Sequence, residues 1–182
     1  MRKMKRAFVL AGITAGMMLI AGYWNINRKV PPAVVEEVKI GEQMEFQEGI
    51  MISVNSYCFL SDEDQKQLYE KAGGEPVSES RILEVRLTIE NTTAESKKII
   101  MSDLYVEGIG MQNGVSKYII DSSEERYSSL QQELQPGERK KICFPYNILP
   151  NQISKKEWET IEERRFWLVF SSYPIKKKLL LS

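Results

Sequence analysis

The clearest two-residue periodicity in the sequence lies in Arg81-Ile-Leu-Glu-Val-Arg-Leu-Thr-Ile-Glu90. Apolar and polar residues alternate here, and successive side chains of a β-strand point to opposite faces of its sheet. The stretch therefore predicts an antiparallel strand with one buried face and one solvated face. The predicted buried face carries Leu83, Val85, Leu87 and Ile89, and the solvated face carries Glu84, Arg86, Thr88 and Glu90.

Shorter stretches with the character of β-strands lie on both sides of this one. Turn-forming residues separate them, notably Asn91-Thr92-Thr93, Asn113-Gly114 and Leu134-Gln-Pro-Gly-Glu138. Asn-Gly predicts the tight turn of a hairpin, because both residues tolerate a positive φ. The sequence predicts further strands over residues 50–60, 99–107, 115–121, 140–146, 166–170 and 175–181.

Two short helices are expected between the strands. Ser61-Asp-Glu-Asp64 and Ser154-Lys-Lys-Glu157 resemble capping boxes, in which a serine and an acidic residue three positions later satisfy the first turn of a helix. They predict helices over residues 61–72 and 154–163. Many short strands separated by turns, with one or two short helical insertions, indicate an all-β sandwich or barrel.

An uncharged stretch of 18 residues, Ala7 to Trp24, precedes this region. About 20 apolar residues are needed for a helix to cross a hydrocarbon core of about 30 Å. Arg2, Lys3, Lys5 and Arg6 come before the stretch, and such positive clusters remain cytoplasmic. A cleaved signal peptide is the alternative, but the end of the stretch lacks the small residues of a cleavage site. The sequence therefore favours an uncleaved signal anchor with an extracytoplasmic C-terminal domain.

The predicted domain organisation follows from these segments. A cytoplasmic basic stub covers residues 1–6, a transmembrane helix residues 7–24, an extended linker residues 25–43, and the sandwich domain residues 44–182. Pro31-Pro32 favours extended polyproline geometry in the linker.

The composition excludes several kinds of chemistry. The chain contains no histidine, so it lacks the commonest general base and transition-metal ligand. All 25 acidic residues follow the apolar stretch, as against 21 of the 25 basic ones, and such a mildly acidic body argues against nucleic-acid binding. No catalytic, metal or cofactor-binding motif is present, so we expect a protein that is not an enzyme and needs no cofactor.

Two motifs together resemble those of a known family. They are residues 81–93, a strand that ends in Asn-Thr-Thr, and Leu134-Gln-Pro-Gly-Glu138 followed by Ile142-Cys-Phe-Pro145. This pattern is similar to that of telokin-like, immunoglobulin-like domains on the surface of Gram-positive bacteria, a family largely of unknown function. The resemblance implies an immunoglobulin-like antiparallel β-sandwich in the cell envelope, and it implies no activity.

The basic run Lys176-Lys177-Lys178 is the candidate surface contact. Lysines on an edge strand protect a sheet from aggregation, which is the simpler explanation. The alternative is contact with anionic lipid head groups or an anionic wall polymer.

The two cysteines, Cys58 and Cys143, are expected to remain free thiols. Cys58 shares the parity of Ile50, Ile52 and Val54, so an unbroken strand would bury it. Cys143 lies between Ile142 and Phe144 and would point away from the core. Opposite faces of a sheet cannot supply the Cβ separation of about 3.5–4.5 Å that a disulfide needs. Cys58 should therefore react slowly, and Cys143 faster.

These observations predict a membrane-anchored, non-catalytic extracytoplasmic module whose partner is another envelope protein or an anionic wall polymer. An accessory subunit of a membrane transport or secretion complex is the first alternative. A cell-wall-acting enzyme is the second, and the missing histidine and motifs argue against it.

Overall fold

The computed structural model of the chain describes residues 2–71, 73 and 79–181, with side chains from residue 12 onward. The chain divides into two compact units, Met1–Val34 and Val35–Ser182. The helix α1 (Arg2–Lys29) makes up most of the first unit. The predicted linker over residues 25–43 is thus shorter than expected. The helix continues to Lys29, and residues Val34–Val38 form the strand β1.

The segment predicted to span a membrane, residues 7–24, is helical throughout because it lies within α1. The side chains of residues 7–11 lie outside the described part of the chain. Among the residues that the structure does describe, no helix is both long enough and apolar enough to cross a membrane.

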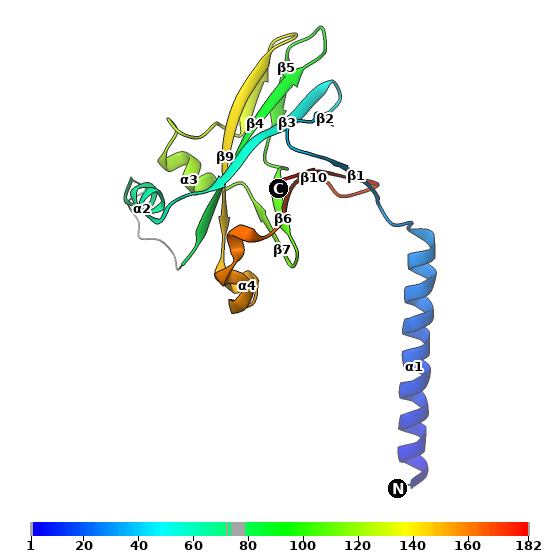
Figure 1. Ribbon diagram of the computed structural model, residues 1–182. Helices are drawn as coiled ribbons and strands as arrows, with labels where there is room; N and C mark the ends of the chain where they lie inside the picture. Colours follow the sequence, from blue (N-terminus) through cyan, green and yellow to red (C-terminus); the bar gives the residue numbers. More distant parts are fainter. Residues whose placement is uncertain (1, 72, 74–78, 182) are drawn as a thin grey trace. The chain divides into compact units, whose positions relative to one another are not determined.

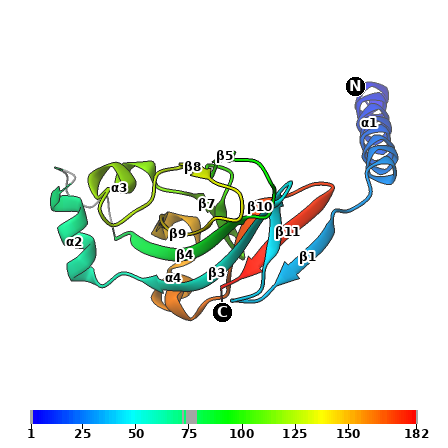
Figure 2. The same ribbon diagram turned by 90° about the horizontal axis from the view of Figure 1, so that it is seen from above.

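The second unit is a β-sandwich built from two larger sheets (Figure 1, and from above in Figure 2). One sheet has the order β2 (Met44–Gln47), β3 (Ile50–Phe59), β4 (Arg81–Asn91) and β9 (Arg139–Ile148). The other has the order β1, β11 (Ile175–Leu180), β10 (Phe166–Ser171), β6 (Tyr105–Gly108) and β7 (Met111–Gly114). A separate pair joins β5 (Lys97–Ile100) to β8 (Gln131–Leu134).

The long strand β4 lies between β3 and β9, antiparallel to both. Its inner face is the one that the alternation predicted, and the four apolar side chains on that face are fully buried. Val85, for example, lies opposite Tyr57 on one side and Phe144 on the other. The core between the sheets therefore forms around β4, with Phe166, Leu168 and Leu179 supplied by the other sheet.

Residues 115–121 form no strand, contrary to the expectation, because residues 117–122 are the helix α3 (Lys117–Ser122). Ile119 and Ile120 are adjacent in sequence and both buried, which the opposite faces of a strand would not allow on a single core. With the buried Ser123 and half-buried Val115, they follow the spacing of a helix.

The predicted strand over residues 99–107 is also divided. Its first part belongs to β5 and its last part to β6, which lie in different sheets. The hairpin that joins β6 to β7 turns at Ile109-Gly110, since Gly108 pairs with Met111. Gly110 supplies the positive φ of that turn, at 82°. The turn expected at Asn113-Gly114 is therefore wrong, and these two residues end β7.

Both predicted helix starts are confirmed. The helix α2 (Asp62–Lys71) begins after Ser61, whose Oγ accepts from the backbone N–H of Asp64 at 3.1 Å. The helix α4 (Lys155–Glu159) has a complete capping box between Ser154 and Glu157, and a short 3-10 turn, η2 (Ile161–Glu163), follows it. A second such turn, η1 (Pro150–Gln152), follows β9.

The turn after β4 is fastened by Asn91, a fully buried polar residue. Its Nδ2 donates to the carbonyl oxygens of Glu95, Leu134 and Gln135 at 2.7, 3.2 and 3.1 Å. Its Oδ1 accepts from the backbone N–H and the hydroxyl of Thr93 at 3.0 and 2.7 Å. The side chain of Asn91 thus joins the two sequence motifs, the end of β4 and the turn over residues 134–138.

We expect Asn91→Ala to lower the free energy of unfolding by about 3 kcal/mol, because each buried polar group left without a partner costs about 1–3 kcal/mol. Asn113→Ala is the matched control, since its amide exchanges two hydrogen bonds with Gln152 at a half-buried site. It should cost about 1 kcal/mol or less. Urea denaturation of both full-length variants measures the difference, and equal costs would contradict the role given to Asn91.

Candidate functional site

The three lysines predicted as a surface contact lie on β11, and each ammonium group already has a partner within the chain. Lys176 Nζ lies 2.6 Å from a carboxylate oxygen of Glu107. Lys177 Nζ donates to the carbonyl oxygen of Glu45 at 2.8 Å. Lys178 Nζ lies 2.7 Å from Glu37 and 4.5 Å from the centroid of the Trp167 ring. Because β11 lies between β1 and β10, the edge-strand explanation of these lysines is wrong.

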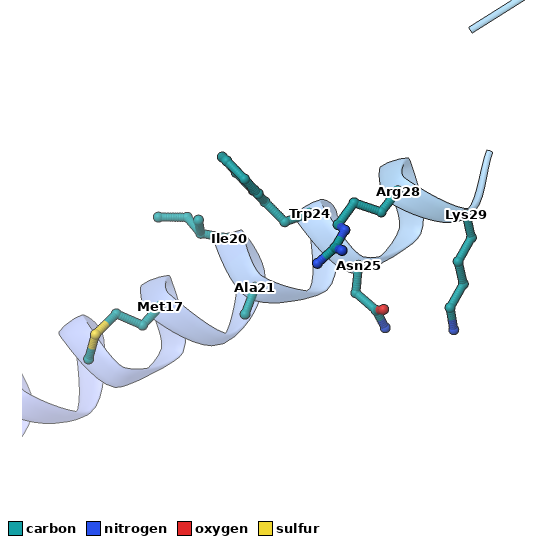
Figure 3. A pocket seen from close by; sticks show the side chains of 7 residues that line it. All are labelled: Met17, Ile20, Ala21, Trp24, Asn25, Arg28 and Lys29. Carbon is teal, nitrogen blue, oxygen red and sulfur yellow. The ribbon is translucent and has the colours of Figure 1, made fainter. Parts of the chain in front are cut away.

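A hollow also runs along α1, lined by side chains from Met17 to Lys29 (Figure 3). Every lining residue belongs to that one helix, and Figure 3 shows the side chains spread along it rather than converging. Side chains of a binding site converge from several elements on one volume. We therefore do not treat this hollow as a site.

The outer face of the four-stranded sheet holds the most distinctive polar cluster, centred on Glu84. This residue is only 1% exposed, although the alternation placed it on the solvated face. Arg86 Nη2 donates to Glu84 Oε1 at 2.5 Å, and Arg126 Nε donates to Glu84 Oε2 at 2.8 Å. The two guanidinium groups thus share one buried carboxylate, which satisfies the rule that a buried charge must be paired.

The segment that covers Glu84 is the connection between β7 and β8, which includes α3. Two hydrogen bonds hold its end against β9: the N–H of Ser128 donates to the carbonyl oxygen of Cys143 at 3.0 Å, and the N–H of Cys143 donates to Ser128 Oγ at 3.1 Å. Tyr127, the residue before Ser128, is buried, and Arg126 Cζ lies 5.7 Å from the centroid of the Tyr127 ring. The connection therefore covers the part of the outer face around Glu84.

The two cysteines flank this cluster on the same face of the sheet. Between Val54 and Ser56 the register of β3 shifts, so that no residue of β4 lies opposite Asn55 in the strand pairing. This bulge reverses the parity of the strand, so Cys58 lies opposite Glu84 on the outer face and is exposed. Cys143 lies opposite Arg86 on the same face and is half-buried.

Both cysteines are free, as predicted, but for a different reason. Cys58 is on β3 and Cys143 on β9, with β4 between them. Strands two places apart lie about 9.6 Å from each other, and a disulfide needs Cα atoms within about 7 Å. The expected order of exposure is also wrong, because it rested on an unbroken β3.

Burial makes the Cys143 thiol and the Tyr127 phenol poor nucleophiles. Burial raises the pKa of the Cys143 thiol to about 12, and the nearby Glu84 carboxylate adds to the effect. Burial also raises the pKa of the Tyr127 phenol, although Arg126 opposes it. A thiol that stays protonated is a weak nucleophile. The two arginines hold the Glu84 carboxylate in a fixed position.

Sequence reasoning missed Glu84 and Arg126 as members of a site. The alternation in β4 shows which side chains share a face, and it carries no information about what covers that face. One signal was available: the helical spacing of Val115, Ile119 and Ile120, which predicts a short helix with one apolar face in place of a strand.

We expect Cys58 to react faster than Cys143 with a neutral maleimide at pH 8, because Cys58 is exposed and Cys143 is half-buried with a strongly raised pKa. Labelling kinetics of Cys58→Ser and Cys143→Ser, each with one thiol left, measure the two rates. Equal rates would show that the outer face is more open than described.

We further expect Glu84→Gln to lower the free energy of unfolding by about 1–3 kcal/mol. Breaking a buried ion pair costs about 3–5 kcal/mol, and solvent around the arginines, 57% and 33% exposed, reduces that figure. Glu90→Gln on the same strand is the control: its 3.2 Å pair with Arg139 is more exposed, so it should cost less than about 1 kcal/mol. Chemical denaturation compares them, and a Glu84→Gln cost no larger than the control would refute this role.

Comparison with known proteins places the chain in a family without assigning an activity. No protein with curated function matches it. Among solved structures it is similar to an uncharacterized beta-sandwich protein from Clostridium difficile 630, with 15% identity and a TM-score of 0.47 over 84% of this chain and 97% of that one. It is also similar to a secreted protein from Mycobacterium tuberculosis, with 9% identity and a TM-score of 0.47 over 81% and 97%. Residues 33–177 match the family described as a domain of unknown function (DUF5028), and the chain therefore belongs to that family.

Proposed function

We propose that the chain is a non-catalytic binding module of the cell envelope, held at the membrane by its N-terminal segment with the β-sandwich outside the cytoplasm. The proposed partner is another envelope protein or an anionic wall polymer. The uncharged stretch over residues 7–24 and the four basic residues before it support the anchor. The family match begins at residue 33, after α1 has ended, so the sandwich is separable in sequence from the proposed anchor.

One observation carries the non-catalytic part of the proposal, namely the state of the buried polar cluster. General acid–base catalysis needs a group whose pKa lies near the working pH and that can reach a substrate. Glu84 is buried and already accepts from two arginines, and the pKa of Cys143 is raised to about 12. Such groups fix the shape and charge of a surface, which is the requirement for binding.

An immunoglobulin-like relationship is part of the same proposal. The two motifs that carry the resemblance, the end of β4 and the turn at residues 134–138, meet at the side chain of Asn91. A contact between motifs so distant in sequence gives the pattern a physical reason, because the asparagine at the end of one strand needs the carbonyl groups of the other turn.

The orientation can be tested on the full-length chain with a C-terminal tag. Protease added outside intact cells should remove the tag, and the N-terminus of the membrane-bound protein should be that of the full chain. A cytoplasmic protein that stays intact is the control. A protected tag, or a mature N-terminus near Tyr23, would contradict the proposed anchor.

The basic cluster before the apolar stretch offers a matched variant. Changing Arg2, Lys3, Lys5 and Arg6 to glutamine should lower the fraction of tags removed from outside, because positive flanks determine orientation. Changing Lys97 and Lys98 in the sandwich should leave that fraction unchanged.

A further inference from the structure

A hollow of about 390 Å³ opens on the outer face of the four-stranded sheet, beside the Glu84 cluster. Arg86 from β4, Lys141 from β9 and Arg126 from the connection before β8 line it, together with Ser56 and Ser128. Three separate segments of the chain thus supply its cationic side chains. This convergence distinguishes it from the hollow along α1.

The charges around this hollow do not balance. No acidic side chain lines it, and Glu84 lies buried next to it. Arg86 and Arg126 both pair with Glu84, and Asp64 also acts electrostatically on Arg126, whereas Lys141 has no ion pair within the part of the chain that the structure describes. A concave surface whose lining is cationic and carries no carboxylate attracts an anion.

The Glu84 carboxylate also prearranges the donors. Each arginine uses one nitrogen on Glu84, Arg86 its Nη2 and Arg126 its Nε. A guanidinium group has five N–H donors, so several remain on each side chain for a ligand. Holding these side chains before the ligand arrives lowers the entropy cost of binding.

The positions of the donors favour a tetrahedral anion. Lys141 pairs with Thr88, two residues along the same face from the Arg86–Cys143 pair, so Arg86 and Lys141 are diagonal neighbours with Cβ atoms less than about 8 Å apart. Arg126 approaches from the covering segment. Donors from three directions suit the three terminal oxygens of a phosphate group, whereas a planar carboxylate is satisfied by one guanidinium fork.

We propose that this hollow binds a phosphate group through Arg86, Arg126 and Lys141. The inference rests on the proposed function, and it names the chemistry of the ligand as a phosphate ester. That ester can belong to a soluble or polymeric phosphate or to a phospholipid head group. Cys143 lines the same hollow, and its protonated thiol places no negative charge beside the ligand.

Cys143 provides a local readout of occupancy. In the full-length Cys58→Ser protein in neutral detergent, the rate at which a neutral maleimide labels Cys143 is measured with inorganic phosphate and with chloride at equal ionic strength. We expect phosphate to slow the labelling several-fold and to saturate at millimolar concentration, since a bound anion covers the thiol and disfavours its ionisation. Chloride should have little effect.

Two variants test the residues and a third is the control. Arg86→Gln and Lys141→Gln should each raise the half-saturating phosphate concentration about tenfold, which corresponds to about 1.4 kcal/mol. Arg86→Gln should leave the fold intact because Arg126 still pairs with Glu84. Lys141→Gln should do so because the Lys141 side chain is exposed. Lys140→Gln changes the same charge on the same strand but on the opposite face, and it should shift the value less than about twofold.

A second arm identifies the source of the phosphate group. The same labelling is followed in phosphatidylcholine vesicles, with and without phosphatidylglycerol, and with added glycerol 3-phosphate. Slowing that depends on phosphatidylglycerol assigns a lipid head group, and slowing by glycerol 3-phosphate in phosphatidylcholine vesicles assigns a soluble or polymeric ester. Either result supports the proposal if Lys141→Gln weakens it.

The proposal is overturned if neither arm slows the labelling of Cys143, or if Lys140→Gln weakens the effect as much as Lys141→Gln. Failure here is distinguishable from failure of the proposed function, because the protease assay reports orientation independently of any ligand. A tag removed from outside together with unchanged labelling would leave the envelope module intact and reject only the phosphate site.

Discussion

The outer half of this sandwich is organised by the need to neutralise one buried carboxylate. Glu84 lies near the middle of β4, and a carboxylate without partners would be costly at 1% exposure. Arg86 comes from the same strand, but Arg126 has to be brought from the connection between β7 and β8. That connection is therefore held across the sheet, and Arg126 and Ser128 of the connection line the hollow beside it.

The pairing also decides which kind of chemistry this face can support. Both oxygens of Glu84 accept from the arginines, whereas the outward side of each guanidinium keeps hydrogen-bond donors. The pairing that fixes the Glu84 carboxylate thus leaves donors for the anion that we propose to bind here. Cys143 is part of this arrangement, because its backbone anchors Ser128 while its side chain lines the hollow.

Much of the fold could be predicted from the sequence, because the strands around the core show their two-residue period directly. The strands observed at Ile50–Phe59, Arg81–Asn91, Arg139–Ile148 and Phe166–Ser171 agree with the expectation. The strand predicted over residues 115–121 was wrong because buried and exposed residues do not alternate there. Around Ile119 and Ile120 two neighbouring residues are buried together, and only a helix that covers a sheet explains that pattern. The site was out of reach for the same reason, since covering is a tertiary event that no local period encodes.

The bulge at Asn55 has a consequence for how β3 tolerates changes in length. The unpaired residue changes which positions face the core. Before it, even-numbered residues such as Ile52 and Val54 face inward, and after it the odd-numbered Tyr57 and Phe59 do. Deleting Asn55 would restore one regular alternation along the whole strand. Tyr57 and Phe59 would keep facing inward and Ser56 and Cys58 outward, because Ser56 would follow Val54 in an unbroken alternation and only the bulge would be lost. Loss of the one unpaired residue therefore preserves the facing of both halves of the strand, whereas one residue inserted between Ser56 and Phe59 would turn the residues beyond it to the other face. Homologues with one residue fewer between Val54 and Leu60 should lack the bulge and keep the same inward-facing positions.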